Sequence, residues 1–296
     1  MGRKEMSYYD IIGDVHGSAT KLKALLGELG YRQDGSGVYR HPDRTAVFVG
    51  DLIDRGTEQL EVLQLVKPMV DAGSAQIVMG NHEFNAICWA TEDPETGKPL
   101  REHSENKRNQ HKDFLTLTDE DQAYYVEWFK TLPLWLDLGG IRVIHACWHE
   151  ASMKVVRDIT GSDRLSTVEH FAEANTPGTT LNDAIEVLLK GPEISLVDYG
   201  MVPYYDFESG KDRTDARVRW WDHDAATLPA LAELRAAKLE NRDPYPHFEP
   251  RPVDAAHLDY VYKARVPLFY GHYWREWESQ RDEWTTYTAC VDFSGG

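Results

Sequence analysis

Short apolar runs that end abruptly in glycine and polar residues constrain the fold of this chain more than any other feature. "YYDII" (8–12) is followed at once by "GDVHG", "TAVFV" (45–49) by "GDLIDRG", and "AQIVM" (75–79) by "GNHE". Two later runs behave alike, since "IRVIH" (141–145) ends in a histidine and "VPLFY" (266–270) precedes "GH". Such β-branched and aromatic runs predict β-strands that stop where the polar residues begin.

Amphipathic stretches separate the first three predicted strands. Leucines recur on one face of residues 19–30, and residues 58–73 repeat the pattern, so both are expected to be helices. Strands that alternate with helices predict an α/β fold, here a layered core of β-sheets flanked by helices. A sixth apolar run at 286–293 is expected to be a further strand, and the polar stretch 91–112 a long excursion.

The length of the chain allows one large core with a smaller cap, because 296 residues can bury that much apolar surface. We expect residues 1–296 to form a single domain. Within it, 151–264 is expected to be an inserted, mainly helical cap, since helical patterns at 181–190 and 225–240 alternate there with proline-rich sequence.

Composition excludes several classes of protein. No apolar run approaches the roughly 20 residues that span a bilayer, and the N-terminal residues lack the apolar region of a secretory signal. Cys88, Cys147 and Cys290 are widely spaced, which fits a reducing cytoplasm better than a disulfide framework. We therefore expect a cytoplasmic protein without a membrane partner.

The net charge of −17 bears on possible partners. An acidic surface repels the phosphates of DNA and RNA, which disfavours nucleic acid as a partner. It also repels any phosphorylated substrate, so a site for one needs positive charge of its own. Arg55, within "GDLIDRG", could supply it, because a guanidinium binds two phosphate oxygens at once.

The polar residues after the strands suggest a metal site. In an open α/β sheet, ligands bind outside the carboxyl ends of the strands, so these side chains are expected to meet. Their carboxylate, amide and imidazole groups are ligands of first-row metals, and six of them suit two ions that share a carboxylate. Two such ions clamp the oxygens of an in-line displacement at phosphorus. The expected ligands are Asp14, His16, Asp51, Asn81, His145 and His272.

Each motif alone has a plainer explanation. A lone Gly-Asp after a strand is usually a turn, and His145 or His272 by itself is more often a hydrogen-bonded core histidine. Their joint occurrence at the ends of successive strands favours the metal site. Histidines outside the motifs, such as His111, have no expected role.

The motifs "GDVHG", "GDLIDRG" and "GNHE", in this order, resemble the three signatures of the calcineurin-like metallophosphoesterases. More narrowly they resemble the phosphoprotein phosphatase branch, with its serine/threonine phosphatases and bacterial diadenosine tetraphosphatases. His145 and His272 match the two later histidines of the pattern. The resemblance covers roughly 8–90, 130–150 and 265–296, where "ACVDFSGG" resembles the family's closing strand and one further strand is expected to be missing.

The resemblance implies a role for each matching ligand. Asp14 and His16 would bind the first metal ion, and Asp51 would bridge both. Asn81, His145 and His272 would bind the second.

The resemblance also implies catalytic roles. Asp54 and His82 would form a carboxylate–imidazole pair in which His82 is the general acid, and Arg55 would hold the phosphate. Family members usually present a second arginine; Arg217 and Arg219 are candidates, and Arg219 is the expected substrate-binding residue. Glu83 is expected to hydrogen-bond behind the ligands.

The function implied is hydrolysis of phosphate monoesters by direct attack of a metal-bridging hydroxide, with a phosphoprotein or small phosphate ester as substrate. The alternative is a dinucleoside polyphosphate or other nucleotide hydrolase, in which some of the nine tryptophans stack on a base. A hypothesis of another functional class is a metal-bound scaffold or regulatory domain that has lost turnover. Two ions are expected, with Mn²⁺ the first choice and Fe, Zn²⁺, Ni²⁺ or Co²⁺ compatible with the same ligands.

Overall fold

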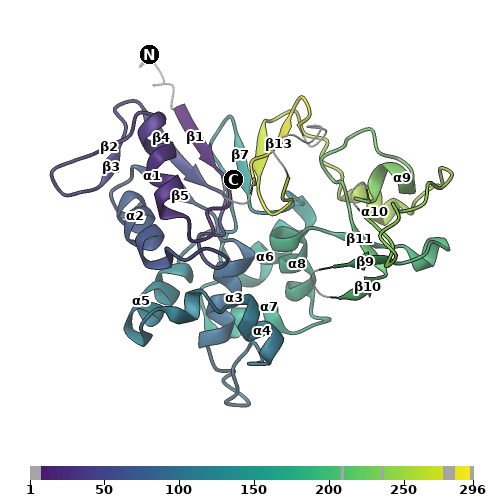
Figure 1. Ribbon diagram of the computed structural model, residues 1–296, viewed down its shortest axis with the longest axis horizontal. Helices are drawn as coiled ribbons and strands as arrows, with labels where there is room; N and C mark the ends of the chain where they lie inside the picture. Colours follow the sequence, from purple (N-terminus) through teal and green to yellow (C-terminus); the bar gives the residue numbers. More distant parts are fainter. Residues whose placement is uncertain (1–7, 208–209, 235–236, 276–283, 294–296) are drawn as a thin grey trace.

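The computed structural model describes residues 8–207, 210–234, 237–275 and 284–293 (Figure 1). Its two larger β-sheets form the centre of the molecule. The first contains three parallel strands, in the order β1 (Tyr8–Ile12), β4 (Arg44–Phe48) and β5 (Ala75–Ile77). The second contains four strands, in the order β13 (Thr288–Cys290), β12 (Leu268–Tyr270), β7 (Arg142–Ile144) and β6 (Trp135–Asp137). Only the β6–β7 pair is antiparallel.

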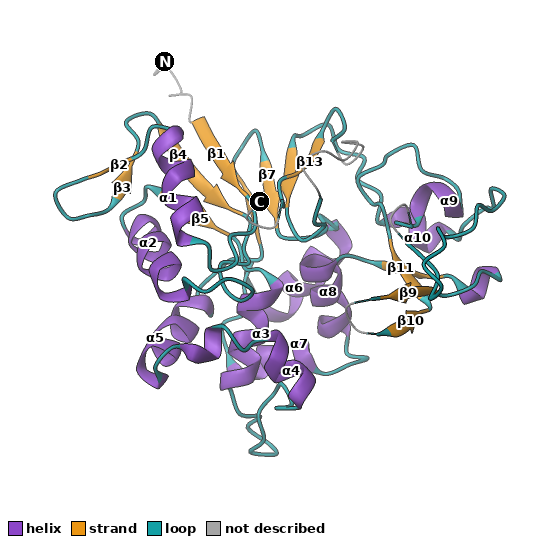
Figure 2. Ribbon diagram, in the orientation of Figure 1, coloured by secondary structure: helices purple, strands orange, loops and turns teal. Residues whose placement is uncertain are grey.

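Alternation along β4 shows how the two sheets pack. Ala46 and Phe48 belong to the core cluster that also contains the leucines of α1 (Ala19–Glu28) and α2 (Gln59–Asp71). Val47 and the following Val49 belong to a second cluster with Val143 of β7. Because neighbouring side chains of a strand point to opposite faces, the first sheet has helices on one face and the second sheet on the other (Figure 2).

The second sheet is covered on its outer face by aromatic residues. Trp220 and Trp221 are buried, and their ring centroids lie 4.6 and 5.5 Å from that of Tyr270 on β12. Tyr273 packs against the same group. These two tryptophans therefore fill the core instead of presenting a platform for a nucleobase.

The predicted core elements are confirmed. All six predicted strands appear, as β1, β4, β5, β7, β12 and β13, and both predicted helices appear, as α1 and α2. None of the described helices is both long and apolar enough to cross a bilayer. Short elements that the sequence patterns did not reveal complete this part of the chain: β2 (Arg32–Gln33), β3 (Tyr39–Arg40), α3 (Asn81–Ala90) and α5 (Asp119–Phe129).

The polar excursion predicted at 91–112 carries one short helix, α4 (Glu105–Gln110), and is followed by a 3-10 turn, η1 (Phe114–Thr116). It leaves from the end of α3 and returns before α5, and these two helices pack against each other. The excursion is exposed over most of its length, but His111 and Phe114 are buried at its return. Its end thus belongs to the core.

The segment 151–264 is not a mainly helical cap throughout. Its first part is helical: α6 (Glu150–Thr160), α7 (Val168–Asn175) and α8 (Thr180–Lys190) pack together, and α7 also contacts α3. Its second part consists of loops and short elements, which Figure 1 shows beside the core. They are β8 (Glu193–Ser195), η2 (Val197–Tyr199), β9 (Tyr204–Asp206), β10 (Lys211–Arg213), β11 (Asp215–Arg217), α9 (Leu228–Leu231) and α10 (Ala255–Asp259).

The helix predicted at 181–190 is confirmed by α8, but that at 225–240 is wrong. Only the four residues of α9 are helical among the described residues of this stretch. Ala232 instead forms a β-bridge with Val218, and Lys238 forms one with Pro244. These contacts outweigh the helix propensity of an alanine-rich sequence.

The packing between the sheets makes a stability prediction. Val143→Ala should lower the free energy of unfolding by about 2 kcal/mol, because it leaves a cavity among fully buried valines. Val202→Ala is the matched control, since Val202 is 50% exposed. Urea denaturation measures both, and an equal effect of the two substitutions would contradict the sheet-on-sheet core.

Candidate functional site

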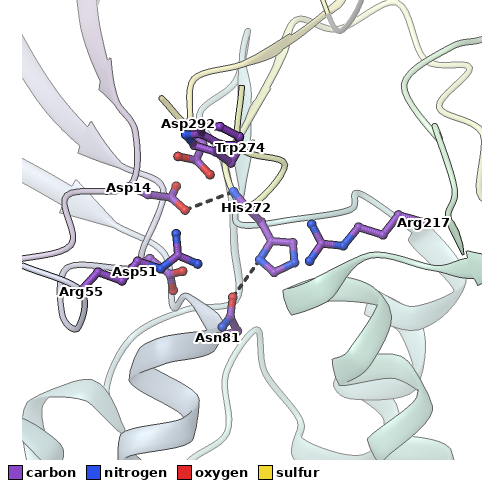
Figure 3. Close-up of a pocket in the computed structure, with 8 residues that line it drawn as sticks. All are labelled: Asp14, Asp51, Arg55, Asn81, Arg217, His272, Trp274 and Asp292. Atoms are coloured by element: carbon purple, nitrogen blue, oxygen red, sulfur yellow. Dashed lines mark hydrogen bonds between the residues drawn. The ribbon is translucent and has the colours of Figure 1, made fainter. Parts of the chain in front are cut away.

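The loops that follow the central strands meet at one edge of the two sheets. Asp14 and His16 follow β1, Asp51, Asp54 and Arg55 follow β4, and Asn81 and His82 begin α3 directly after β5. His145 follows β7 and His272 follows β12. Figure 3 shows five of these residues around one pocket: Asp14, Asp51, Arg55, Asn81 and His272.

Backbone strain is concentrated at this edge. Among the residues that the structure describes, six other than glycine have a positive φ, between 44° and 71°. Five of the six are expected site residues, and L-residues adopt this conformation only where the surrounding structure holds them in it. They are His16, Asp51, Asp54, Arg55 and His272.

Glu83 holds two of the loops together. Its buried carboxylate accepts hydrogen bonds from the backbone N–H groups of Asp51 (2.9 Å), Leu52 (2.8 Å) and Gly80 (3.0 Å). The loops approach so closely that a Cβ on Gly50 would lie 2.5 Å from the Gly80 nitrogen. The turn after β4 and the start of α3 are therefore fixed relative to each other, and Glu83 hydrogen-bonds behind the expected ligands Asp51 and Asn81.

Asp51 is shared by two groups of possible metal ligands. One group is His16, Asp51 and His82, the other is Asp51, His145 and His272, and the ligand atoms of each lie within 4.8 Å of one another. The two carboxylate oxygens face different histidines: Oδ2 is 3.8 Å from Nε2 of His16, and Oδ1 is 3.5 Å from Nε2 of His145. One carboxylate between two groups is the arrangement expected of a bridging ligand.

The orientation of the histidines fits a metal site. Nδ1 of His16 donates to the carbonyl oxygen of Ile53 (2.9 Å) and Nδ1 of His145 to that of Val49 (2.8 Å). This leaves each Nε2 with a lone pair. Nε2 of His145 then lies 3.0 Å from Oδ1 of Asn81, so that a lone pair of the imidazole faces a lone pair of the amide oxygen. A cation bound by both atoms would offset their repulsion. Burial lowers the pKa of His16 to about 4, which favours the neutral, metal-binding form.

Buried polar atoms without a hydrogen-bond partner give a second test of fit. Nε2 of His16, Nε2 of His272 and Oδ1 of Asp14 are in this state. Unsatisfied buried polar atoms are rare in folded proteins because each is costly. Nε2 of His16 lies 3.8 Å from Oδ2 of Asp51, and Asp14 lines the same pocket as Asp51, so both atoms suit cation ligands. His272 turns its other ring nitrogen, Nδ1, toward Oδ1 of Asn81 (2.8 Å). The residues present fit the expected group.

Asp292 is a residue of this edge that the sequence analysis missed. It follows β13, is buried, and lines the pocket together with Asp14 (Figure 3). Burial and the charge of Asp292 raise the pKa of Asp14 well above its ordinary value. Two neighbouring buried carboxylates favour a nearby cation. The sequence showed only a strand here, because a single Asp after "ACV" forms no motif by itself.

The expected pair of Asp54 and His82 has the predicted geometry. Nδ1 of His82 lies 2.6 Å from Oδ2 of Asp54, and Nε2 of His82 points toward Asp51. Burial alone would lower the pKa of His82, but the charges of Asp51 and Asp54 outweigh it and raise the pKa. A third residue, His111, also contacts Asp54, through its Nδ1 at 2.9 Å.

The structure corrects the choice of the second arginine. Arg219 is buried outside the pocket, where its guanidinium donates to the carbonyl oxygen of Ala230 (3.1 Å) and lies near Asp222 and Glu233. The strand β11 ends at Arg217, and two residues later the backbone N–H of Arg219 donates to the carbonyl oxygen of Leu231 in α9 (2.7 Å). The backbone and the side chain of Arg219 are thus both held against α9. Arg217 lines the pocket instead, with its guanidinium over the ring of Tyr273.

The pocket has a volume of about 420 Å³ and two arginines in its wall. Figure 3 shows Arg55 and Arg217 extending toward it from opposite sides, with His272 and Asn81 between them and Asp51 beside Arg55. Trp274 also lines it and is 48% exposed. The pocket thus offers local positive charge beside the carboxylates, as a phosphate site on an acidic protein requires.

Comparison with known proteins identifies relatives of part of the chain. A bis(5'-nucleosyl)-tetraphosphatase PrpE (asymmetrical) of Oceanobacillus iheyensis is 35% identical over 148 residues, 46% of this chain and 54% of that protein. Another of the same name, from Halalkalibacterium halodurans, is 52% identical over 75 residues, 25% of this chain and 30% of that protein. The chain therefore spans about half or less of these curated relatives.

Among solved structures, the cold-active protein-tyrosine phosphatase of a psychrophilic Shewanella species has a TM-score of 0.44. It is 15% identical to this chain, and the alignment covers 98% of this chain and 73% of that one.

The sequence profile of the family described as calcineurin-like phosphoesterase matches residues 9–275. The match extends from β1 to the loop after β12 and so includes every expected ligand. The chain therefore belongs to the calcineurin-like metallophosphoesterases.

Proposed function

We propose that this protein hydrolyses phosphate monoesters at the edge where the loops meet. The observation that carries the proposal is that Arg55 and Arg217 line the same pocket as Asp51. The ligands proposed for two metal ions are Asp14, His16, Asp51, Asn81, His145 and His272. When bound, such ions supply Lewis acidity, which activates water and neutralises phosphate charge. Mn²⁺ is the ion to test first, since oxygen and nitrogen ligands suit it.

The arginines act as the phosphate clamp in this proposal. A phosphate group approaches a protein of net charge −17, so binding requires local cations that offset the repulsion. Arg55 and Arg217 approach the pocket from opposite sides and can each donate to phosphate oxygens (Figure 3). The ester group then lies toward the open side of the pocket.

His82 is the proposed proton donor. A water-derived oxygen attacks phosphorus, the bond from phosphorus to the ester oxygen breaks, and the proton of His82 Nε2 passes to the departing oxygen. The proton lost by the attacking water replaces it. Asp54 on Nδ1 orients the ring and stabilises its protonated form. The raised pKa of His82 supports this role.

Dinucleoside polyphosphates are the second candidate substrate. The relatives from Oceanobacillus and Halalkalibacterium carry the name of tetraphosphatases that act on bis(5'-nucleosyl) compounds. Trp274, half-exposed at the pocket, offers a surface on which a base can stack. In this case the nucleotide is the leaving group and the same clamp holds a phosphate of the chain.

A substrate panel tests the function. The Mn²⁺-loaded protein should hydrolyse p-nitrophenyl phosphate and a phosphopeptide faster than bis(p-nitrophenyl) phosphate; faster turnover of diadenosine tetraphosphate would favour the second candidate. His82→Asn should lower kcat on the phosphopeptide by about a hundredfold or more, because the departing alkoxide loses its proton donor. His223→Asn, on an exposed histidine, is the control. Full turnover by His82→Asn on every substrate would refute the proposed mechanism.

Metal content tests the ligand set. Asp51→Asn should reduce the metal bound per chain after loading with Mn²⁺ and dialysis, since the amide removes the charge from the one carboxylate shared by both groups. Elemental analysis gives the stoichiometry. Asp119→Asn, on an exposed carboxylate, should leave it unchanged; equal metal in all three proteins would argue against a centre at Asp51.

The two arginines make separable predictions. Arg217→Ala should weaken inhibition by inorganic phosphate by about tenfold to a hundredfold, the typical loss for a hydrogen bond to a charged group. Arg219→Ala should instead lower the midpoint of urea unfolding, because it removes a buried guanidinium that lies near Asp222 and Glu233 and donates to the carbonyl oxygen of Ala230. The inhibition constant and the unfolding midpoint are measured for both variants, and the reverse pattern would restore Arg219 as the phosphate ligand.

A further inference from the structure

His111 reaches the catalytic edge from a part of the chain that the metal-site motifs do not include. It follows α4, at the end of the polar excursion, and is only 2% exposed. Its Nδ1 lies 2.9 Å from Oδ2 of Asp54, 57 residues away in sequence. This is the same oxygen that Nδ1 of His82 contacts at 2.6 Å. One carboxylate oxygen therefore accepts from two imidazoles.

The surroundings hold Asp54 from its other sides as well. Its Oδ1 accepts a long hydrogen bond from the backbone N–H of Phe114 (3.4 Å), and its own N–H donates to Oε1 of Gln59 (2.8 Å). The ring of Phe114 packs against that of His111, with centroids 5.0 Å apart. The return of the excursion thus closes over Asp54 with a donor for each oxygen.

We propose that His111 is a positioning residue for ester cleavage, which holds Asp54 in the orientation that aims His82 at the departing oxygen. This inference rests on the proposed function, because it requires His82 to be the proton donor. His111 is outside the residues that line the pocket and outside both groups of possible metal ligands, and its contact toward the site is with Asp54, so it acts through Asp54.

The physical argument concerns rotation of the carboxylate. With His82 as the only side-chain donor, Asp54 could turn about its terminal torsion, which has a broad energy minimum. A second N–H on Oδ2 and the backbone N–H on Oδ1 restrict this rotation. Burial would raise the pKa of Asp54, but the hydrogen bonds from His111 and His82 hold it below its ordinary value. Asp54 then stays ionised and can stabilise protonated His82.

The need for His82 depends on the leaving group, and this dependence provides the readout. An alkyl phosphate releases a strongly basic alkoxide, which requires a proton as the bond breaks. A dinitrophenyl phosphate releases a stable phenolate, which does not. Loss of positioning should therefore slow the first reaction much more than the second, whereas general damage to the fold would slow both.

The experiment uses the full chain loaded with Mn²⁺ and compares β-glycerol phosphate with 2,4-dinitrophenyl phosphate. His111→Leu should lower kcat on the alkyl ester by about tenfold to a hundredfold, the usual effect of losing a group behind a ligand or catalytic residue. Its kcat on the dinitrophenyl ester, both KM values and the metal content should change little. His111→Asn, which keeps an N–H near the position of Nδ1, should restore most of the loss.

A matched control comes from the same excursion. His103 stacks on Trp89 and contacts its carbonyl oxygen, but it does not contact Asp54. His103→Leu should leave the ratio of the two kcat values unchanged. Metal content and urea unfolding show whether His111→Leu folds. If it does not, His111→Asn is compared with wild type instead. A loss of kcat on the alkyl ester that is greater in His111→Asn than in His103→Leu would overturn the inference.

A double-mutant cycle gives the final test. In an Asp54→Asn background, His111→Leu should cause no further loss on the alkyl ester, because the residue through which it acts has lost its charge. Additive losses, or an equal loss on both esters, would overturn the inference while leaving the proposed function intact. A wild-type protein that hydrolyses neither ester would overturn the proposed function and this inference together.

Discussion

The three backbone hydrogen bonds to the carboxylate of Glu83 are the interaction on which the site depends. They join the turn after β4 to the first turn of α3, so Asp51 and Asn81 are held at a fixed separation although they are 30 positions apart in the sequence. The same bonds hold Asp51 at a φ of 49°, which an isolated turn would not keep. Rigid backbone at this point allows a carboxylate and an amide to be in place before any ligand arrives.

Much of the fold and of the site could be predicted because both follow from local patterns. Apolar runs of five residues identify the strands, and the polar residues directly after them must emerge at the same edge when the strands are parallel. Asp14, Asp51 and His272 come together for this reason alone. Side-chain packing does not enter this prediction, because the parallel topology alone brings the carboxyl ends of the strands together.

The remaining features depend on contacts that no local pattern records. Arg217 and Arg219 lie two residues apart in one motif, and only the hydrogen bonds of Arg219 to Ala230 and Leu231 of α9 distinguish it from Arg217, which lines the pocket. His111 lies in a polar stretch that looks like solvated surface, yet its ring is buried against Phe114. The alanine-rich stretch around Ala232 has helical composition, but bridges to distant residues determine its conformation. In each case a partner far along the chain outweighs the local preference.

The order in which the chain can build this centre follows from one contact described by the structure. The backbone N–H of His272 donates to Oδ2 of Asp14, which is 258 residues earlier in the chain. An early and a late part of the pocket wall therefore meet only after the intervening segments have been made and have found their places. Contacts of such long range slow folding, because the loop must close before it gains any stabilisation. During synthesis, the early loops emerge with their carboxylates exposed and complete their environment only when β12 docks beside β7.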